Sequence, residues 1–553
     1  IPLLKDRSRR YKLFEKLPGI VSWTILISPF ALSLINPLIM VYILIVYLLI
    51  WFAKAIGVNI RVLEGWRMLQ KQQKLNWQAL NSDLEAGQVT DVVAERPKWH
   101  LVNLERLQKQ PTPVKVADIL QAIIVAAYNE GLDVLEPTIH SLLNSHYDLN
   151  KVILVFAYEG RDGAKSEAAV RELVAKYGHK FRHTMTTKHP LTPDEVRGKG
   201  PNISYAGRAL QAYIIEHKID PLNVIVTTLD ADNRPHPSYL AAVAYTYAVS
   251  PDPRHTSYQP IPLYTQNIWD APAPARVVAT GNSFFQIMAA MRLHALRNFS
   301  AHAQGLASLI DTDFWSTRTI VEDGHQFWRT YFRYDGNHEV YPVFVPIYQD
   351  AVFAGTFRKT LVAQFVQLRR WAWGCSDIAY VAEMGFFRKN NVNKRDLIAK
   401  FWRLCEGHIS WATAALLIAG AAFIPAFLNP NNYAAIQLPI IASRIETIAL
   451  AGIVITLFLS ILTLPPKPAR YKRRRTILMV VQWVYLPFTT VIYNGLSGLY
   501  SQTRLMLGMY MDTFDVTEKA VAHDASGQAA VSAPSHQVWW RGKKLSRLFR
   551  RAK

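Results

Sequence analysis

Apolar residues are spread very unevenly along this chain, and their distribution limits the folds open to it. Half of the 553 residues are hydrophobic. They concentrate at residues 19–56 and again at 409–493, whereas the region between them has the composition of an ordinary globular protein. A helix of about 20 apolar residues is long enough to cross the hydrocarbon core of a bilayer. The sequence therefore predicts a large globular domain between two groups of membrane helices.

The turn signal Asn36-Pro37 divides the first apolar region into residues 19–35 and 38–56. Because Pro breaks a helix, we expect a tight helical hairpin with both flanks in the cytoplasm, and one long tilted helix is the alternative. Three more apolar segments follow at 409–428, 446–464 and 476–493. The last is short and contains Pro487, so we expect four spans with this fifth segment not fully crossing, against an alternative of five or six.

The net charge of +21 is compatible with nucleic acid or with an anionic membrane as partner. The cations lie beside the apolar segments, at residues 5–16, 467–475 and 541–553. Loops of this kind stay in the cytoplasm. We therefore expect membrane lipids and not nucleic acid as partners, and a multi-pass protein of the cell (inner or plasma) membrane with its globular domain in the cytoplasm. The two cysteines, Cys375 and Cys405, have no spacing typical of a disulfide framework or metal site.

The central region alternates short apolar runs with longer helical stretches. Residues 119–126, 152–156 and 224–228 are the clearest candidate strands. Nearly continuous apolar runs of this length are typical of strands buried on both faces of a mostly parallel sheet. The expected fold class is therefore an α/β, Rossmann-like nucleotide-binding domain combined with α-helical transmembrane segments.

Composition suggests the following division of the chain. We expect a basic N-terminus and transmembrane hairpin at 1–57, an interfacial helical linker with Trp66, Trp77 and Trp99 at 58–115, the globular domain at 116–395, interface and transmembrane helices at 396–500, a further segment at 501–519, and a flexible linker with a basic tail at 520–553.

Two carboxylates, Asp230 and Asp232, directly follow the candidate strand 224–228. Open α/β sheets bind ligands at the carboxyl ends of their strands. Carboxylates at i and i+2 in that position can hold Mg²⁺ or Mn²⁺, with diphosphate oxygens completing the coordination. Many loops contain such a pair by chance, so the strand in front of it is what gives the pattern its meaning.

A second acidic pair, Glu322-Asp323, opens a segment that continues with Gly324 and His325. A carboxylate near a bound sugar donor could remove the proton of an attacking hydroxyl as a general base. The alternative is an acidic pair that stabilises a helix N-terminus through the helix dipole.

The run Gln367-Leu368-Arg369-Arg370-Trp371 forms a Q-x-x-R-W pattern. In a helix, Gln367, Arg370 and Trp371 lie on one face. Arg suits phosphate through its planar fork of donors, and Trp offers a flat surface on which a sugar ring can stack. An amphipathic helix at the membrane interface would explain the composition of this run but not its order behind the two acidic pairs.

Together, Ala126-Ala127-Tyr128-Asn129-Glu130, Asp230-Ala231-Asp232, Glu322-Asp323 and Q-L-R-R-W resemble membrane-embedded family 2 glycosyltransferases, the group of cellulose, chitin and hyaluronan synthases. The resemblance covers residues 116–375. It implies a GT-A fold, a nucleotide-sugar donor, usually UDP-linked, and a divalent cation.

The resemblance also implies a role for each matching residue. Asp323 would be the catalytic base with Glu322 beside it, and Asp232 would bind the metal with Asp230 beside the donor. Tyr128 and Glu130 would border the nucleotide, and Gln367, Arg370 and Trp371 would hold diphosphate and acceptor. Lys199, in Gly198-Lys199-Gly200-Pro201-Asn202, resembles a lysine near the donor. Phe514-Asp515-Val516-Thr517-Glu518-Lys519 is similar to the F-x-V-T-x-K gating loop of cellulose synthases, in which Thr517 and Lys519 would approach the donor phosphates.

Two departures from the family pattern matter. Where many relatives carry an Asp-Asp pair after the second strand, this chain has Glu159, which we expect to take that place beside the nucleotide. Cellulose synthases continue with further helices after the gating motif, whereas here a linker and basic tail follow. The expected function is an inverting glycosyltransferase that builds a polysaccharide processively. The alternatives are single transfer to a lipid acceptor and, third, a non-enzymatic basic membrane protein.

Overall fold

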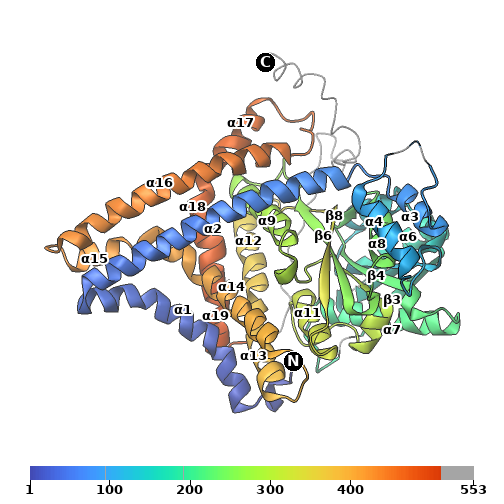
Figure 1. Ribbon diagram of the computed structural model, residues 1–553, viewed down its shortest axis with the longest axis horizontal. Coiled ribbons are helices and arrows are strands. Elements are labelled where there is room, and N and C mark those ends of the chain that lie inside the picture. Colours follow the sequence, from blue (N-terminus) through green and yellow to red (C-terminus); the bar gives the residue numbers. More distant parts are fainter. Residues whose placement is uncertain (92, 94, 163, 191, 512–553) are drawn as a thin grey trace.

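A computed structural model describes residues 1–511 of the chain except 92, 94, 163 and 191. An α/β domain lies at one end of the molecule, and a group of long helices extends from it (Figure 1). Four described helical segments are long and apolar enough to cross a membrane: Arg9–Ile35, Pro37–Gln72, Tyr433–Leu462 and Arg474–Met506.

The α/β domain is built on one eight-stranded sheet with the order β3-β2-β1-β4-β7-β6-β8-β5. Strands β1, β2, β3 and β4 are parallel, β7 runs antiparallel to β4 and β6, and β6 is parallel to β8. The strands are β1 (Leu120–Ala127), β2 (Val152–Glu159), β3 (His183–His189), β4 (Val224–Asp230), β5 (Arg234–Pro235), β6 (Thr256–Tyr264), β7 (Ala303–Gly305) and β8 (Glu339–Gln349).

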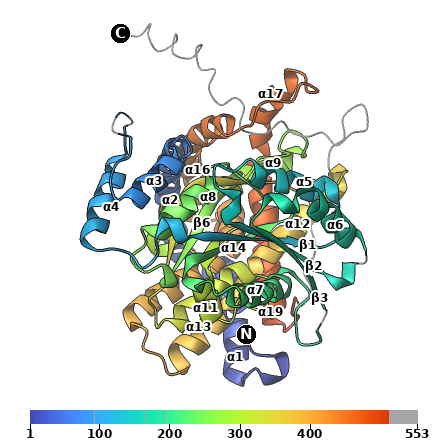
Figure 2. The same ribbon diagram turned by 90° about the vertical axis from the view of Figure 1, so that its right-hand side faces the viewer.

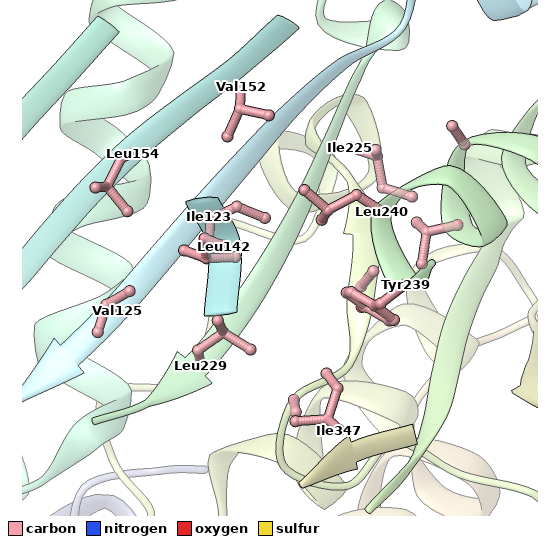
Figure 3. Packing of buried hydrophobic residues seen from close by; sticks show 14 of the residues in the cluster. Ile123, Val125, Leu142, Val152, Leu154, Ile225, Leu229, Tyr239, Leu240 and Ile347 are labelled. Carbon is pink, nitrogen blue, oxygen red and sulfur yellow. The ribbon is translucent and has the colours of Figure 1, made fainter. Parts of the chain in front are cut away.

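Helices cover both faces of the sheet (Figure 2). The alternation of β1 shows why: Ile123 and Val125 point into one core, and Ala122 and Ile124 into the other. The first core is closed by α5 (Leu132–Leu143), α6 (Lys165–Tyr177) and α8 (Tyr239–Ala248). Figure 3 shows Leu142 of α5 and Tyr239 and Leu240 of α8 packed with residues of the strands. The second is closed by α7 (Lys199–Glu216) and α10 (Leu306–Asp311). The expected mostly parallel, Rossmann-like α/β domain combined with membrane-length helices is therefore confirmed.

The remaining helices include the membrane-length group and the helices that contact it. Helix α2 (Pro37–Gln72) packs on α9 (Ala273–Ala290), where a Cβ on Gly65 would lie 2.6 Å from Ile287 Cγ2. Only glycine allows so close an approach. The others are α1 (Arg9–Ile35), α11 (Glu322–Arg333), α12 (Phe357–Ala372), α13 (Asp377–Ala382), α14 (Lys394–Gly420), α15 (Phe423–Leu428), α16 (Tyr433–Leu462), α17 (Arg474–Val481), α18 (Leu486–Thr489) and α19 (Ser497–Met506).

The N-terminal hairpin forms as predicted, with Asn36 capping α2 through hydrogen bonds from the backbone N–H of Leu38 and Ile39. Toward the C-terminus, residues 409–428 are divided between α14 and α15 and do not form one of the four membrane-length segments, although Leu417 and Ala421 pack with Met40 and Leu44 of α2. Residues 476–493, expected not to cross fully, belong to the membrane-length segment Arg474–Met506. Which of these segments cross a bilayer stays a prediction.

The segment expected at the membrane interface is helical but packs on the α/β domain. Its helices α3 (Trp77–Ala86) and α4 (Lys98–Lys109) lie against α8. Trp77 is buried with its ring 5.5 Å from that of Tyr245, and Asn81 Nδ2 donates to the carbonyl of Ala241 at 2.9 Å. Burial of apolar surface therefore draws this part of residues 58–115 onto the globular domain.

Candidate active site

The two parallel strands at the centre of the sheet end at the same edge, and Asp230 is the last residue of β4. It lies in register with Ala126 at the end of β1. Both of its carboxylate oxygens are engaged: Lys199 Nζ donates to Oδ1 at 2.6 Å, and Ser300 Oγ donates to Oδ2 at 2.7 Å. Because β1 and β4 are adjacent parallel strands, the carboxylate of Asp230 lies at the edge where α/β sheets bind ligands.

Asp232 follows in the turn after β4 and is only 5% exposed. Its Oδ2 accepts a long hydrogen bond of 3.4 Å from the backbone N–H of Asp350, at the end of β8. Hard oxygen donors of this kind suit Mg²⁺ or Mn²⁺. Since Asp230 would have to give up a protein contact to bind a cation, the donor set fits Asp232 as the principal ligand and Asp230 as its neighbour. Among the described residues, no group of three or more His, Cys, Asp or Glu side chains forms a closed metal cage.

Glu322 and Asp323 form the first turn of α11. Burial and then the neighbouring Asp323 carboxylate raise the pKa of Glu322 to about 8. Burial also raises the pKa of Asp323, against the opposing effects of Lys199, the Gly324 N–H and Arg370. That N–H donates to Asp323 Oδ1 at 2.7 Å. A carboxylate held with a raised pKa is suited to accept a proton.

Lys199 is the first residue of α7, and its side chain is about nine-tenths buried. Burial lowers its pKa, but the carboxylates of Asp230 and Glu322 outweigh this effect and raise the pKa above its ordinary value. The chain comes close here, since a Cβ on Gly200 would lie 2.5 Å from the carbonyl oxygen of Ser316 and 3.1 Å from Glu322 Cβ. The start of α7 therefore places the ammonium group of Lys199 among the acidic side chains.

The Q-x-x-R-W run is helical, as predicted, and forms the end of α12. Gln367 Oε1 accepts from Gln364 at 3.1 Å. Trp371 lies with its ring centroid 6.0 Å from that of Tyr264, the last residue of β6. Burial, followed by Asp230, Asp323 and Asp232, raises the pKa of this tyrosine, whereas Arg370 opposes the shift. The two acidic pairs and the helix of the Q-x-x-R-W run therefore converge around Tyr264.

The predicted nucleotide-side residues also come together. The backbone N–H of Tyr128 donates to Glu130 Oε2 at 2.5 Å, across a turn in which Asn129 has a φ of 64°. Arg161 forms an ion pair with Glu159 at the end of β2 and lies 4.3 Å above the ring of Tyr128. A small pocket beside them is lined by Glu159, Arg161, His189, Glu195, Val196, Arg197, Gly198 and Pro201.

Thr517 and Lys519 lie outside the residues that the structure describes. Sequence reasoning missed Tyr264, Ser300 and Arg161. Tyr264 and Ser300 belong to no recognisable motif, and only the fold brings them to Trp371 and Asp230. Arg161 had a weak signal, because it follows Glu159 by two residues.

No known protein family matches this sequence, and neither does any curated protein. Solved structures resemble it distantly. A mannosyltransferase from Pyrobaculum calidifontis, solved with GDP-Man and Mn²⁺, is 15% identical over 84% of this chain and 99% of its own, with a TM-score of 0.40. TarS 1-349 from S. aureus, solved with UDP-GlcNAc, is 10% identical over 71% and 93%, with a TM-score of 0.35. GalNAc-T7, solved with UDP, GalNAc and Mn²⁺, is 11% identical over 55% and 58%, with a TM-score of 0.28.

The raised pKa of Glu322 predicts a pH dependence of stability. Folded, this group keeps a proton that the unfolded chain releases above its ordinary pKa of 4.5. The free energy of unfolding therefore falls as pH rises from about 5 to 8. Glu322→Gln removes this contribution. We expect the melting temperature of the wild type minus that of Glu322→Gln, measured in detergent, to fall across this range. A difference that stays constant or grows would contradict the burial of this carboxyl group.

Proposed function

We propose that this chain is a membrane-bound inverting glycosyltransferase of GT-A type that uses a nucleotide-sugar donor, with a UDP-sugar expected, and builds a polysaccharide processively. The observation that carries the proposal is the meeting of Asp230, Asp232 and Lys199 with Asp323 and the helix of the Q-x-x-R-W run around Tyr264. Acidic, cationic and aromatic groups gathered at the carboxyl edge of an α/β sheet suit a sugar diphosphate.

Each group has a chemical part in this proposal. Asp232, with Asp230 beside it, would hold Mg²⁺ or Mn²⁺, which when bound neutralises charge on the departing diphosphate. Lys199 and Arg370 would add positive charge on the same leaving group. Asp323, with its raised pKa, would take the proton of the acceptor hydroxyl as that oxygen attacks the anomeric carbon. Trp371 and Tyr264 would hold the acceptor sugar in line, and Tyr128, Glu130, Glu159 and Gln367 would border the donor.

The end of the described chain supports a part for Thr517 and Lys519. Tyr510 and Met511 pack with Val196, Ile320 and Val321, which lie shortly before Lys199 and Glu322 in sequence. Thr517 and Lys519 follow Met511 by six and eight residues, and the sequence resemblance implies that they approach the donor phosphates.

Contacts of the basic regions support a cytoplasmic α/β domain. Arg10, in the first turn of α1, pairs with Glu383 at 3.2 Å, and Arg470, between two membrane-length segments, pairs with Asp270 at 2.8 Å. Both partners lie in the part of the chain attached to the α/β domain, and the α1–α2 turn lies at the opposite end of the helices (Figure 1). The basic loops thus share a side with this domain, as the positive-inside rule requires of a cytoplasmic face.

The proposed base can be tested directly. Membranes or purified protein should release a nucleoside diphosphate from one sugar nucleotide only in the presence of Mg²⁺ or Mn²⁺. We expect Asp323→Asn to lower kcat by about 10²- to 10⁴-fold, as loss of a general base does, with donor binding retained. The exposed carboxylate Asp118 provides a matched control, and Asp118→Asn should leave kcat unchanged. Wild-type kcat in Asp323→Asn would exclude this residue as the base.

A second candidate function, single transfer to a phosphate-bearing lipid acceptor, is favoured by a basic loop at residues 467–475. Arg470 and Tyr471 bind Asp270, and Arg475 donates to the carbonyl of Trp269 at 2.6 Å. Trp371 and Tyr471 pack on the same apolar cluster, which includes Tyr264 and Trp269. Lys472, Arg473 and Arg474 remain exposed next to this cluster, where the membrane-length segment Arg474–Met506 begins. A lipid phosphate in the headgroup region would lie close to both the cations and the aromatic acceptor site.

Neutralising these cations separates the two functions. If the acceptor is a polyprenyl phosphate, the variant Lys472→Gln/Arg473→Gln/Arg474→Gln should raise its KM about 10-fold or more, since each cation near the surface contributes about 1 kcal/mol. The donor KM should not change. The control Arg9→Gln/Lys12→Gln/Lys16→Gln removes three exposed charges from α1. Equal losses in both variants, or a ladder of oligosaccharides made without any lipid phosphate, would exclude the lipid-acceptor reading.

A further inference from the structure

Helix α11 carries the proposed base at its first turn and is held on two sides. Toward the sheet, Gln326 Nε2 donates to Thr312 Oγ1 at 3.1 Å and to Gln304 Oε1 at 3.3 Å. On another side, His325 Nδ1 lies 2.7 Å from Asp377 Oδ1. His325 is fully buried, and Asp377 is 4% exposed. Because a carboxylate accepts, the ring nitrogen Nδ1 carries the proton and donates.

The partner residue lies on the chain segment that continues from the Q-x-x-R-W run. Asp377 begins α13, which is separated from α12 only by the turn Trp373–Ser376. It is therefore six residues beyond Trp371. The ring of His325 also packs edge-on against Tyr380 of α13, with 4.5 Å between centroids. One buried contact thus joins the turn that carries Asp323 to the turn that follows Arg370 and Trp371.

Because the contact between His325 and Asp377 is buried, losing it would cost free energy. Burial also lowers the pKa of His325, so its ring is neutral, and its second nitrogen Nε2 has no hydrogen-bond partner among the described residues. Removing the ring would leave Asp377 buried without its donor, which costs about 1–3 kcal/mol. A shift of α11 that relieves this cost would move Asp323, and a shift of about 1 Å in a reacting group can reduce a rate 100-fold.

We propose that His325 and Asp377 are positioning residues that fix Asp323 relative to Arg370 and Trp371, an inference that rests on the proposed glycosyl transfer. Both side chains are buried, so in this proposal they act through Asp323 and not by contact with donor or acceptor. Their hydrogen bond sets the distance between the base on α11 and the acceptor-binding end of α12. Removing this hydrogen bond should therefore slow the chemical step without weakening donor binding.

The test uses the full-length wild type and His325 variants, with the nucleotide sugar that the wild type accepts. We expect His325→Leu to lower kcat about 10- to 100-fold while the donor KM stays within about threefold. His325→Asn keeps an N–H donor at the position of Nδ1 and should retain most of the wild-type kcat. Asp377→Leu should resemble His325→Leu, and the double variant should be no worse than either single one.

A matched control lies on the same helix. Tyr331 OH donates to Asp396 Oδ2 at 2.7 Å and so ties the other end of α11 to α14. Tyr331→Phe should leave kcat unchanged. The inference fails if Tyr331→Phe and His325→Leu lower kcat equally, if His325→Asn is as defective as His325→Leu, or if the donor KM rises while kcat does not. If the wild type processes no sugar nucleotide at all, the proposed function fails and this inference with it.

Discussion

The buried ammonium group of Lys199 holds the proposed site together. Four carboxylates gather at one edge of the sheet, and like charges in a buried place repel each other strongly. Lys199 offsets this repulsion through its 2.6 Å contact with Asp230 and its attraction to Glu322 and Asp323. Even so, burial and then the neighbouring carboxylates keep the pKa values of Glu322 and Asp323 raised. The cluster therefore keeps an unmet demand for positive charge, which a divalent cation at Asp232 and Asp230 would satisfy when the negatively charged donor binds.

The topology of the sheet explains how residues far apart in sequence come together around Lys199. Asp230 lies at the end of β4, Tyr264 at the end of β6, and Asp350 directly after β8. The start of α7 brings Lys199 beneath them, and α11 and α12 bring Asp323 and Trp371. Because α12 packs between the α/β domain and the membrane-length helices, Trp371 lies where the candidate site meets those helices. This arrangement suits the membrane-bound or membrane-crossing acceptor that we propose.

The sequence predicted most of the fold, and it singled out the polar side chains that the structure brings together at the edge of the sheet. The apolar runs that became β1, β2 and β4 are buried on both faces, so their pattern was unambiguous. Asp230, Asp323 and the Q-x-x-R-W run were identified by their order. Tyr264 and Ser300 could not be predicted, because their roles come from strand pairing and loop packing alone. Hydropathy also did not reveal that residues 409–428 are divided between α14 and α15 or that residues 476–493 continue into α19.

The central claim is that one metal-assisted sugar-nucleotide site lies at the carboxyl end of β4. Its most direct test is an electron cryo-microscopy map of the protein in detergent with Mn²⁺ and the nucleoside diphosphate of its donor. The account predicts density for Mn²⁺ at Asp232, with the diphosphate between this ion and Lys199. The nucleobase of the bound nucleotide should lie beside Tyr128. Density for the nucleotide at any other place, or a diphosphate bound at this edge without contact to Asp232, would contradict it.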